Sequence, residues 1–176
     1  METEKLSQST SWEENFVSRL ITSIQRDKGL SARLCRADNP ATEYQSWEFL
    51  AGFGIDLEQE HQRLPFTTVA AAIARAKAER NGSQNLGQAI AACYNDGNQS
   101  DQAKAKLRRI LACDDVAELC RIIRPVLTLI DSRGSRPLDF VRLLQQLRRF
   151  TSDAQRIKAQ WAQDFYGHTQ DEQVAT

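Results

Sequence analysis

Apolar residues that recur every three to four positions along most of the chain are the feature that most constrains its fold. Near the start, four large apolar residues follow one another at intervals of four, Trp12, Phe16, Leu20 and Ile24. Later, the spacing i, i+3, i+4, i+7 is filled by Phe140, Leu143, Leu144 and Leu147. Both patterns place an apolar stripe along an α-helix. No segment alternates apolar and polar residues for more than four positions, so the sequence predicts an all-α protein.

Glycine, proline and polar turn residues divide this pattern into segments. Glycine and proline are scarce, at 8 and 4 of 176 residues, and the segments between them predict eight or nine helices. These helices form one compact bundle over residues 11–167, or two small packed bundles that divide near residues 95–100. We expect the polar ends, residues 1–10 and 168–176, to be flexible tails.

Four local signals predict where particular helices begin, bend or end. Asp114 is expected to cap the helix that follows it. Pro125 falls inside the apolar stripe of that helix and predicts a kink or a break near Arg124. Pro137 is well placed at the first position of the next helix. Gly167 is a suitable C-terminal cap for the last one.

The composition excludes several classes of protein. Hydrophobic residues make up 41% and charged residues 26% of the chain, which is typical of a globular protein and not of a disordered one. No apolar run approaches the roughly 20 residues that span a membrane. The acidic, polar N-terminal stretch predicts neither a secretory signal nor a transit peptide. Four cysteines without a C-x-x-C pair indicate reduced thiols and a cytoplasmic location.

Side chains that catalyse reactions or bind metals are not gathered in a recognisable pattern. His61 lies in an acidic, glutamine-rich stretch and His168 in the polar tail, so both are expected to be structural or solvated. Cys113 and Cys120 lack the two further ligands that zinc needs and are expected to be buried thiols. The Gly-x-Gly at residues 52–54 lacks the preceding strand and the third glycine of a dinucleotide loop. The sequence therefore predicts no catalytic residue, no metal site and no cofactor.

Charged residues are segregated along the chain although the net charge is zero, with 23 basic and 23 acidic residues. Sixteen of the basic residues and only three of the acidic ones fall in four windows, residues 26–36, 75–80, 104–109 and 133–149. The windows carry a net charge of +13, and the remaining 136 residues carry −13. Between residues 37 and 62 there are six acids and no lysine or arginine. The zero total therefore does not argue against a polyanionic partner.

Basic residues at helical spacing suit the phosphates of a nucleic-acid backbone. Lys104 and Arg108 are i, i+4 neighbours, while Arg142 and Arg149 are two turns apart, opposite the apolar stripe of their helix. Such residues bind phosphates without reading base identity. The 13 aromatic residues fall mostly on core stripes, so stacking platforms for bases are not evident. The candidate nucleic-acid-binding residues are Arg26, Lys28, Arg33, Arg36, Arg75, Arg80, Lys104, Arg108, Arg109, Arg142 and Arg149.

Several short strings resemble the CasB family, the small subunit of the type I-E CRISPR surveillance complex Cascade. The string DKGLSARLCRA at residues 27–37 resembles that family's D-x-G-x-x-A-x-L-R-R segment. Further strings follow in the same order: LGQA at 86–89 is similar to L-G-R-A, LRRIL at 107–111 to R-L-R-R-L-L, PLDF at 137–140 to P-L-D-W, and WAQDFY at 161–166 to W-A-x-D-F-Y. The resemblance rests on five motifs in order and covers residues 12–166.

The resemblance implies an all-helical, non-catalytic protein that is present as a pair within Cascade. Its partners would be the other Cascade protein subunits, the guide RNA, the target and displaced DNA strands and a second copy of itself. Its location would be the cytoplasm of a prokaryote, and it would not bind a membrane. It would bind nucleic-acid backbone without sequence specificity and stabilise the guide RNA–target DNA hybrid and the displaced strand. Cys35 and Gln88 stand where the family pattern has arginine, so both are left out of the candidate set.

Two other classes of function are compatible with a helical chain of this kind. A protein–protein adaptor would use the basic faces to dock acidic partners and would have no role with nucleic acid. A ligand-sensing transcription factor would need a helix-turn-helix unit with a polar recognition helix, and none stands out. Retention on nucleic acid at low salt separates the leading hypothesis from the adaptor.

Overall fold

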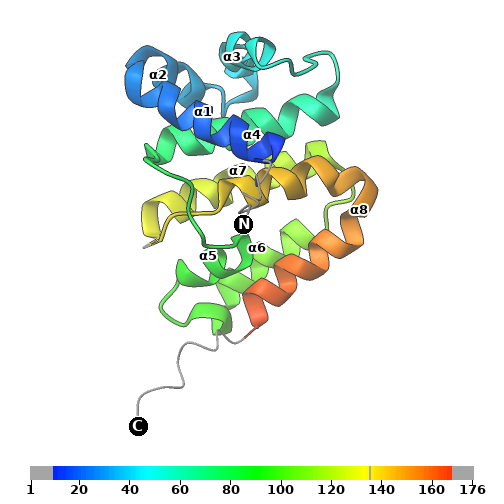
Figure 1. Ribbon diagram of the computed structural model, residues 1–176. Helices are drawn as coiled ribbons and strands as arrows, with labels where there is room; N and C mark the ends of the chain where they lie inside the picture. Colours follow the sequence, from blue (N-terminus) through cyan, green and yellow to red (C-terminus); the bar gives the residue numbers. More distant parts are fainter. Residues whose placement is uncertain (1–9, 135, 168–176) are drawn as a thin grey trace, which may run out of the picture.

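A computed structural model of the protein describes residues 10–134 and 136–167 (Figure 1). This part of the chain contains eight α-helices, two short 3₁₀ helices and no strand. The α-helices are α1 (Trp12–Arg26), α2 (Lys28–Arg36), α3 (Trp47–Gly52), α4 (Glu60–Ala76), α5 (Leu86–Ala92), α6 (Asp101–Leu111), α7 (Val116–Arg133) and α8 (Phe140–Tyr166); the 3₁₀ helices are η1 (Pro40–Ser46) and η2 (Gly97–Gln99). The expected all-α fold is confirmed, whereas both expected tails, apart from Thr10, lie outside the described residues.

Polar side chains begin the first two helices. Ser11 forms a capping box with α1: its Oγ accepts a hydrogen bond from Glu14 N (3.2 Å), and Glu14 Oε2 accepts one from Ser11 N (2.9 Å). Asp27 separates α1 from α2 and caps α2 by accepting a hydrogen bond from Leu30 N (2.9 Å). The basic start of α2 is thereby set directly after the end of α1.

The cap of α7 differs from the expected one. Asp115, and not Asp114, accepts the hydrogen bond from Glu118 N (2.8 Å). Asp114 is almost fully exposed, and its Oδ1 lies 3.8 Å from Lys158 Nζ. The prediction is wrong because either of two adjacent aspartates can cap a helix. The path of the backbone, which the sequence does not show, decides which of them does so.

Two prolines lie inside helices without interrupting them. Of the kink or break expected near Arg124, the break does not occur, since α7 runs as one helix from Val116 to Arg133 through Pro125. Pro65 lies similarly within α4, which begins at Glu60. A proline inside a helix costs about 3 kcal/mol because it removes a donor and crowds the preceding turn. Burial of the apolar stripes of both helices outweighs that cost.

The start of α8 is set by a turn that is distant in sequence. The helix begins at Phe140 with Asp139 as its cap, so the prediction that Pro137 occupies the first helical position is wrong, and Pro137 precedes the helix. Asn81 Oδ1 accepts a hydrogen bond from Phe140 N (2.8 Å), and Asn81 Nδ2 donates one to Asp139 Oδ1 (2.8 Å). This contact joins the turn after α4 to α8 and determines where α8 starts.

Helix α8 bends in its middle, where the sequence pattern indicates two separate helices. Asp153 has non-helical dihedral angles (φ −139°, ψ 32°), and the two halves run in different directions (Figure 1). Across the bend, Trp161 Nε1 donates a hydrogen bond to Gln146 Oε1 (2.7 Å), and Gln146 Nε2 donates one to Gln160 Oε1 (3.1 Å). Trp161 is fully buried, so the first of these bonds is shielded from water and stabilises the bend.

The core is one contiguous cluster of buried side chains to which all eight α-helices contribute. Helix α4 is its central element, because every residue from Leu64 to Ala74 is buried against neighbours that include α2, α7 and α8. Helices α5 and α6 extend the cluster towards the second half of α8 (Figure 1). Within the described ranges, no helix combines the length and apolarity needed to cross a membrane.

Helix α5 crosses α8 at Gly87, where no side chain fits. A Cβ atom at this position would lie 2.4 Å from Trp161 O and 2.6 Å from Phe165 N. Both are backbone atoms of a packed helix, which cannot give way as the end of a flexible side chain can. The position therefore requires glycine.

Gly87→Ala is expected to lower the free energy of unfolding by about 2–3 kcal/mol. In a chain of this size the melting temperature falls by roughly 4–12 °C, which thermal unfolding followed by circular dichroism measures. Gly52→Ala is the matched control, because a Cβ atom at Gly52 meets no atom within 4 Å. Equal melting temperatures for the two variants would contradict the close approach of α5 to α8.

Candidate nucleic-acid interface

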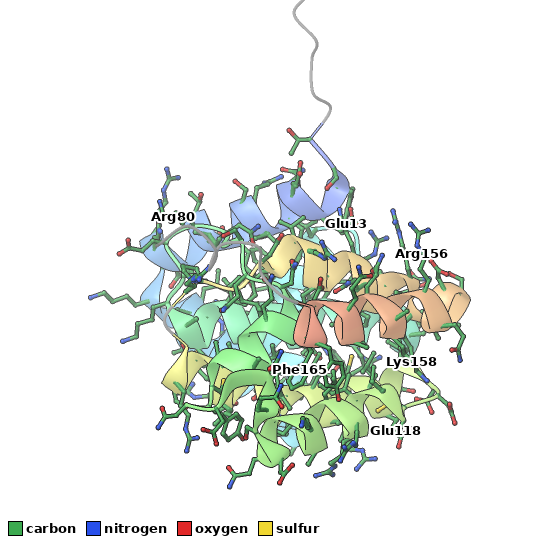
Figure 2. All side chains as sticks on the ribbon, turned by 90° about the horizontal axis from the view of Figure 1, so that it is seen from below. Glu13, Arg80, Glu118, Arg156, Lys158 and Phe165 are labelled. Atoms are coloured by element: carbon green, nitrogen blue, oxygen red, sulfur yellow. The ribbon has the colours of Figure 1, made fainter. Side chains whose placement is uncertain are left out.

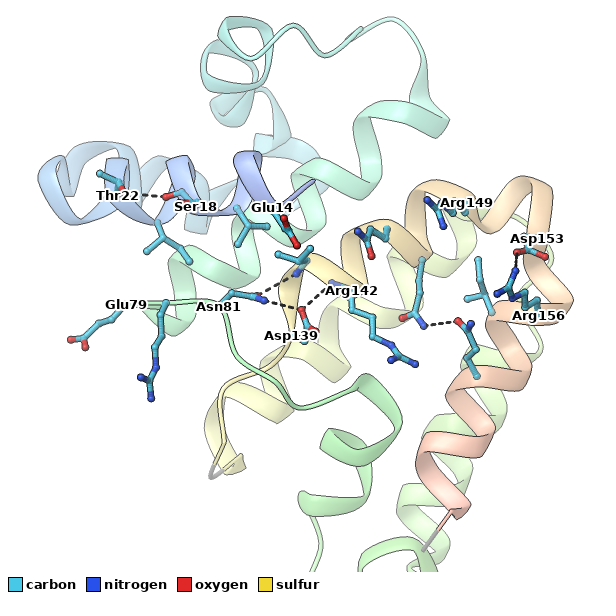
Figure 3. A pocket seen from close by; sticks show the side chains of 18 of the residues that line it. Glu14, Ser18, Thr22, Glu79, Asn81, Asp139, Arg142, Arg149, Asp153 and Arg156 are labelled. Carbon is cyan, nitrogen blue, oxygen red and sulfur yellow. Dashed lines mark hydrogen bonds and ion pairs between the residues drawn. The ribbon is translucent and has the colours of Figure 1, made fainter. Parts of the chain in front are cut away.

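A groove of about 750 Å³ lies between α1 and α8, and residues 79–81, in the turn after α4, form part of its wall. Four arginines line it, Arg80, Arg142, Arg149 and Arg156. Figure 3 shows the three from α8, and Figure 2 shows Arg80 and Arg156 towards opposite ends of the face that carries α1 and α8. The groove thus gathers three of the candidate residues and adds Arg156, which the sequence reasoning missed.

Helical geometry places Arg142 and Arg149 along one side of the first half of α8, and Arg156 follows beyond the bend at Asp153. Arg142, Arg149 and Arg156 are seven residues apart, and seven residues are close to two turns of an α-helix. The same spacing that relates Arg142 to Arg149 continues to Arg156 and is the signal that could have identified it. Arg156 lies outside the four basic windows, so charge density alone does not reveal it.

An ion pair within the protein holds Arg142. Its Nη2 lies 3.3 Å from Asp164 Oδ2, and its side chain is 40% exposed against 16% for Asp164. Burial raises the pKa of Asp164 above its ordinary value, while the Arg142 guanidinium and a hydrogen bond with Asn85 act against that rise. Arg142 is therefore partly neutralised and less available to an external phosphate than its position in the groove suggests.

The other arginines of the groove are more accessible. Arg156 makes only a long contact, with its Nη1 3.9 Å from Asp153 Oδ2. Within the described residues, no ion pair joins Arg80 or Arg149 to a carboxylate, and both side chains are exposed. These two arginines are free to bind an anion from solution with charge-assisted hydrogen bonds.

Four carboxylates also line the groove, Glu14, Glu79, Asp139 and Asp153. Two of them accept hydrogen bonds from backbone N–H groups at helix starts, Glu14 at α1 and Asp139 at α8. The positive end of the helix dipole offsets part of the charge of such groups. The formal charges of the lining cancel, but the available positive charge is concentrated at Arg80 and Arg149.

The other basic residues lie away from this groove. A first group surrounds the turn between α1 and α2 and continues along α2; it consists of Arg26, Lys28, Arg33 and Arg36. A second group belongs to α6 and consists of Lys104, Arg108 and Arg109. All seven are exposed except Arg33 and Lys104, which are half-buried. None lines the groove, and α2 and α6 lie in the upper and lower parts of Figure 1.

Arg75, the remaining candidate, is engaged within the fold. Its Nη2 forms an ion pair with Asp38 Oδ2, which joins α4 to the residues that follow α2. The same aspartate meets a second cation, because Arg124 Nη1 donates a hydrogen bond to Asp38 O (3.2 Å) and Arg124 Nε lies 3.8 Å from Asp38 Oδ1. Arg124 is buried, so Asp38 links α2, α4 and α7.

Two further arginines outside the candidate set are engaged in the same way. Arg148 forms an ion pair with Glu13, and its guanidinium lies 5.0 Å from the ring centre of Trp12. Trp12 is expected on the buried stripe of α1, but it is 41% exposed, and its ring lies against the guanidinium group of Arg148. Arg63 Nε lies 2.6 Å from Glu43 Oε1 in a contact with little solvent exposure.

The cysteine thiols have the properties of buried structural groups. All four are free, and burial raises the pKa of each of them, that of Cys120 to about 11. They are therefore protonated at neutral pH and weak nucleophiles. His61 is exposed on α4, and His168 lies outside the described residues. No group of three or more His, Cys, Asp and Glu side chains in the described ranges is arranged to hold a metal ion.

Comparison with protein families identifies the group to which the chain belongs. The family model of the CRISPR-associated protein Cse2 matches residues 31–166. The chain belongs to the Cse2 family. No curated protein matches the sequence with significance.

Solved structures share the fold of this Cse2-family member at low sequence identity. M. ruber CasB is 23% identical, with a TM-score of 0.69 over 90% of this chain and 94% of that chain. A Cse2-family protein from Thermus thermophilus is 22% identical, with a TM-score of 0.68 over 89% of this chain and 98% of that chain. A chain of a CRISPR RNA-guided surveillance complex is 22% identical, with a TM-score of 0.65 over 88% and 89% of the two chains. The resemblance to the CasB family is thereby confirmed.

Two positions where this family member departs from the family's arginines lie outside the groove. Gln88 Oε1 accepts a hydrogen bond from Asn85 N (3.2 Å) and so completes a capping box at the start of α5. Cys35 is half-buried on α2. Neither side chain lines the groove, so both departures leave its four arginines in place.

Arg75→Ala is expected to lower the free energy of unfolding by about 1–3 kcal/mol, because it leaves Asp38 with only its longer contact to Arg124. The side chains of Arg75 and Asp38 are 21% and 23% exposed, which places the pair between a surface and a buried one. Arg80→Ala is the matched control, with an expected change below roughly 0.5 kcal/mol. Urea unfolding of both variants measures the difference, and equal stabilities would show that Arg75 has no structural role.

Proposed function

We propose that the protein is the non-catalytic small subunit of a type I-E Cascade complex and binds nucleic-acid backbone without sequence specificity. In this role it stabilises the guide RNA–target DNA hybrid and the displaced DNA strand. Membership of the Cse2 family supports the proposal, as does the likeness of the fold to a chain of a CRISPR RNA-guided surveillance complex. The observation that carries it is the groove between α1 and α8, which exposes Arg80 and Arg149.

The dimensions of the groove suit a strand and not a single ion. Arg142 and Arg149 are seven residues apart on the straight first half of α8, which corresponds to about 10.5 Å along the helix axis. A strand that advances about 3.4 Å per nucleotide places phosphates three nucleotides apart at a similar distance. The spacing of Arg142 and Arg149 therefore matches phosphates of one strand, and Arg149 is the more accessible of the two.

Backbone binding is the mode that these residues favour. The residues that line the groove include four guanidinium groups and no aromatic ring, so the groove offers partners for phosphates and no platform on which bases stack. In a guide-directed complex, pairing with the guide RNA supplies sequence recognition, and the exchange of strands is nearly balanced in free energy. A few phosphate contacts are then sufficient to decide whether the opened state persists.

Reversing the charge of the two accessible arginines tests the groove. Arg80→Glu combined with Arg149→Glu is expected to weaken binding of single-stranded DNA at least tenfold and to lower the slope of log affinity against log salt by about two. Filter binding of several sequences at a series of salt concentrations measures both quantities. Arg121→Glu is the matched control, because Arg121 is an exposed arginine of α7 outside the groove.

Unchanged affinity in the double variant would remove the groove from the binding surface. Strong preference for one sequence would contradict backbone binding. Absence of nucleic-acid retention by the wild-type protein at low salt, together with tight association with a protein partner, would assign the chain to the protein–protein adaptors instead.

The basic residues of α2 and α6 form separate surfaces and need a separate test. Reversal of Arg33 with Arg36, or of Arg108 with Arg109, is expected to shorten the lifetime of the opened target DNA in the assembled complex without unfolding the protein. Single-molecule measurement of that lifetime checks this, with circular dichroism as the control for folding. If neither pair changes the lifetime, the phosphate contacts are confined to the groove between α1 and α8.

A further inference from the structure

A second hollow, of about 580 Å³, lies between the ends of α4 and α7 and the segment that leads into α8. Its floor is apolar and is formed by Ala72, Ala76, Leu127, Ile130, Leu138 and Phe140. All of these except Ala76 are buried members of the core, so the floor is rigid. The volume lies within the roughly 300–1,000 Å³ of small-molecule sites, and an apolar face of limited size fits it.

Cations stand at the rim of this apolar floor. Lys77, Arg80 and Arg136 line the hollow, and all three are exposed. In the described part of the chain, none of them forms an ion pair with a carboxylate. Two acids, Glu79 and Asp131, also line the hollow, which leaves a formal net charge of +1. A ligand with an apolar face and an anionic flank matches this combination.

Lys77 occupies a backbone conformation that glycine normally adopts. It ends α4 with φ 48° and ψ 43°, and it is the one non-glycine residue with positive φ among the described residues. A lysine at this position is less stable than a glycine, because its Cβ crowds the backbone in the left-handed region. This conformation ends α4 in the usual left-handed way, with Lys77 N donating a hydrogen bond to Ala74 O (3.2 Å), and a lysine kept there at the rim of a hollow is a candidate for binding a ligand.

The hollow adjoins the groove between α1 and α8. Glu79 and Arg80 line both of them. A strand with a phosphate against Arg80 therefore lies at the rim of the hollow, because Arg80 belongs to that rim.

We propose that the hollow receives one unstacked base of a nucleic-acid strand bound in the groove, while Lys77, Arg80 and Arg136 bind the flanking phosphates. This inference rests on the proposed function and adds a base site to it. The apolar floor carries no polar side chain to read a base edge, so purines and pyrimidines are both accepted. Burial of the base face and contacts with the phosphates supply the affinity.

The test compares a thymidine oligonucleotide with an abasic oligonucleotide of the same length and charge, by fluorescence anisotropy with the full chain at low salt. The wild-type protein is expected to bind the thymidine strand roughly threefold to tenfold more tightly. Ala76→Leu fills the hollow and is expected to make the two affinities equal, at the value for the abasic strand. Arg149→Glu changes the groove outside the hollow, so it should weaken both strands equally and leave their ratio unchanged.

Lys77→Gly separates binding from stability. Glycine relieves the left-handed strain, so the melting temperature is expected to stay equal or rise, while affinity for both strands falls about threefold. Full affinity in this variant would overturn the role of Lys77. Because the variant retains a stable fold, its outcome stands even if Ala76→Leu does not fold.

The possible failures are distinguishable. Equal affinity of the wild-type protein for the two strands would overturn the base site and leave the proposed function standing, whereas no affinity for either strand overturns the proposed function. Binding of a leucine peptide flanked by glutamates, lost in Ala76→Leu and without any preference for thymidine, would assign the hollow to a protein partner and overturn the inference.

Discussion

The buried hydrogen bond from Trp161 to Gln146 joins the two halves of α8, and the rest of the structure depends on the bend that it stabilises. The first half of α8 packs on α4 and forms one wall of the groove, while the second half turns back to receive α5 at Gly87. Gln146 also donates to Gln160, so its amide is satisfied on both sides in a setting where an unpaired polar group would be costly. One polar contact thus sets both the packing of α5 and the path of the arginines along α8.

The arginines of this protein divide into two populations with different physical roles. Arg75 and Arg148 are held by Asp38 and Glu13, and each links segments that are far apart in the chain. A carboxylate partner of this kind fixes the position of the guanidinium group. It also neutralises the positive charge that would otherwise attract a phosphate. Arg80 and Arg149 have no such partner in the described ranges, so their charge remains available.

The helical class and the basic row on α8 could be predicted because both depend on local spacing. A period of three to four residues is visible in any window, and so is the interval of seven between Arg142 and Arg149. The structural partner of Arg75 could not be predicted, since Asp38 is 37 residues away and only the tertiary fold brings them together. The sequence pattern separates the two halves of α8, but the way in which they pack together at Asp153 depends on a bond between side chains 15 residues apart, which local spacing does not reveal.

The balance of positive and negative charge in the whole chain is repeated in the lining of the groove. Its four arginines face four carboxylates, and two of those carboxylates also cap helices, so the structure itself needs them there. Such a lining attracts a phosphate backbone only when the strand is close enough to meet Arg80 and Arg149, because at longer range the opposite charges cancel and salt screens the remainder. Under the proposed function, a groove of this kind binds a free strand at low salt, and its affinity falls steeply as the salt concentration rises. Under the proposed function, the local placement of charge, and not its sum, therefore decides whether the groove binds a strand.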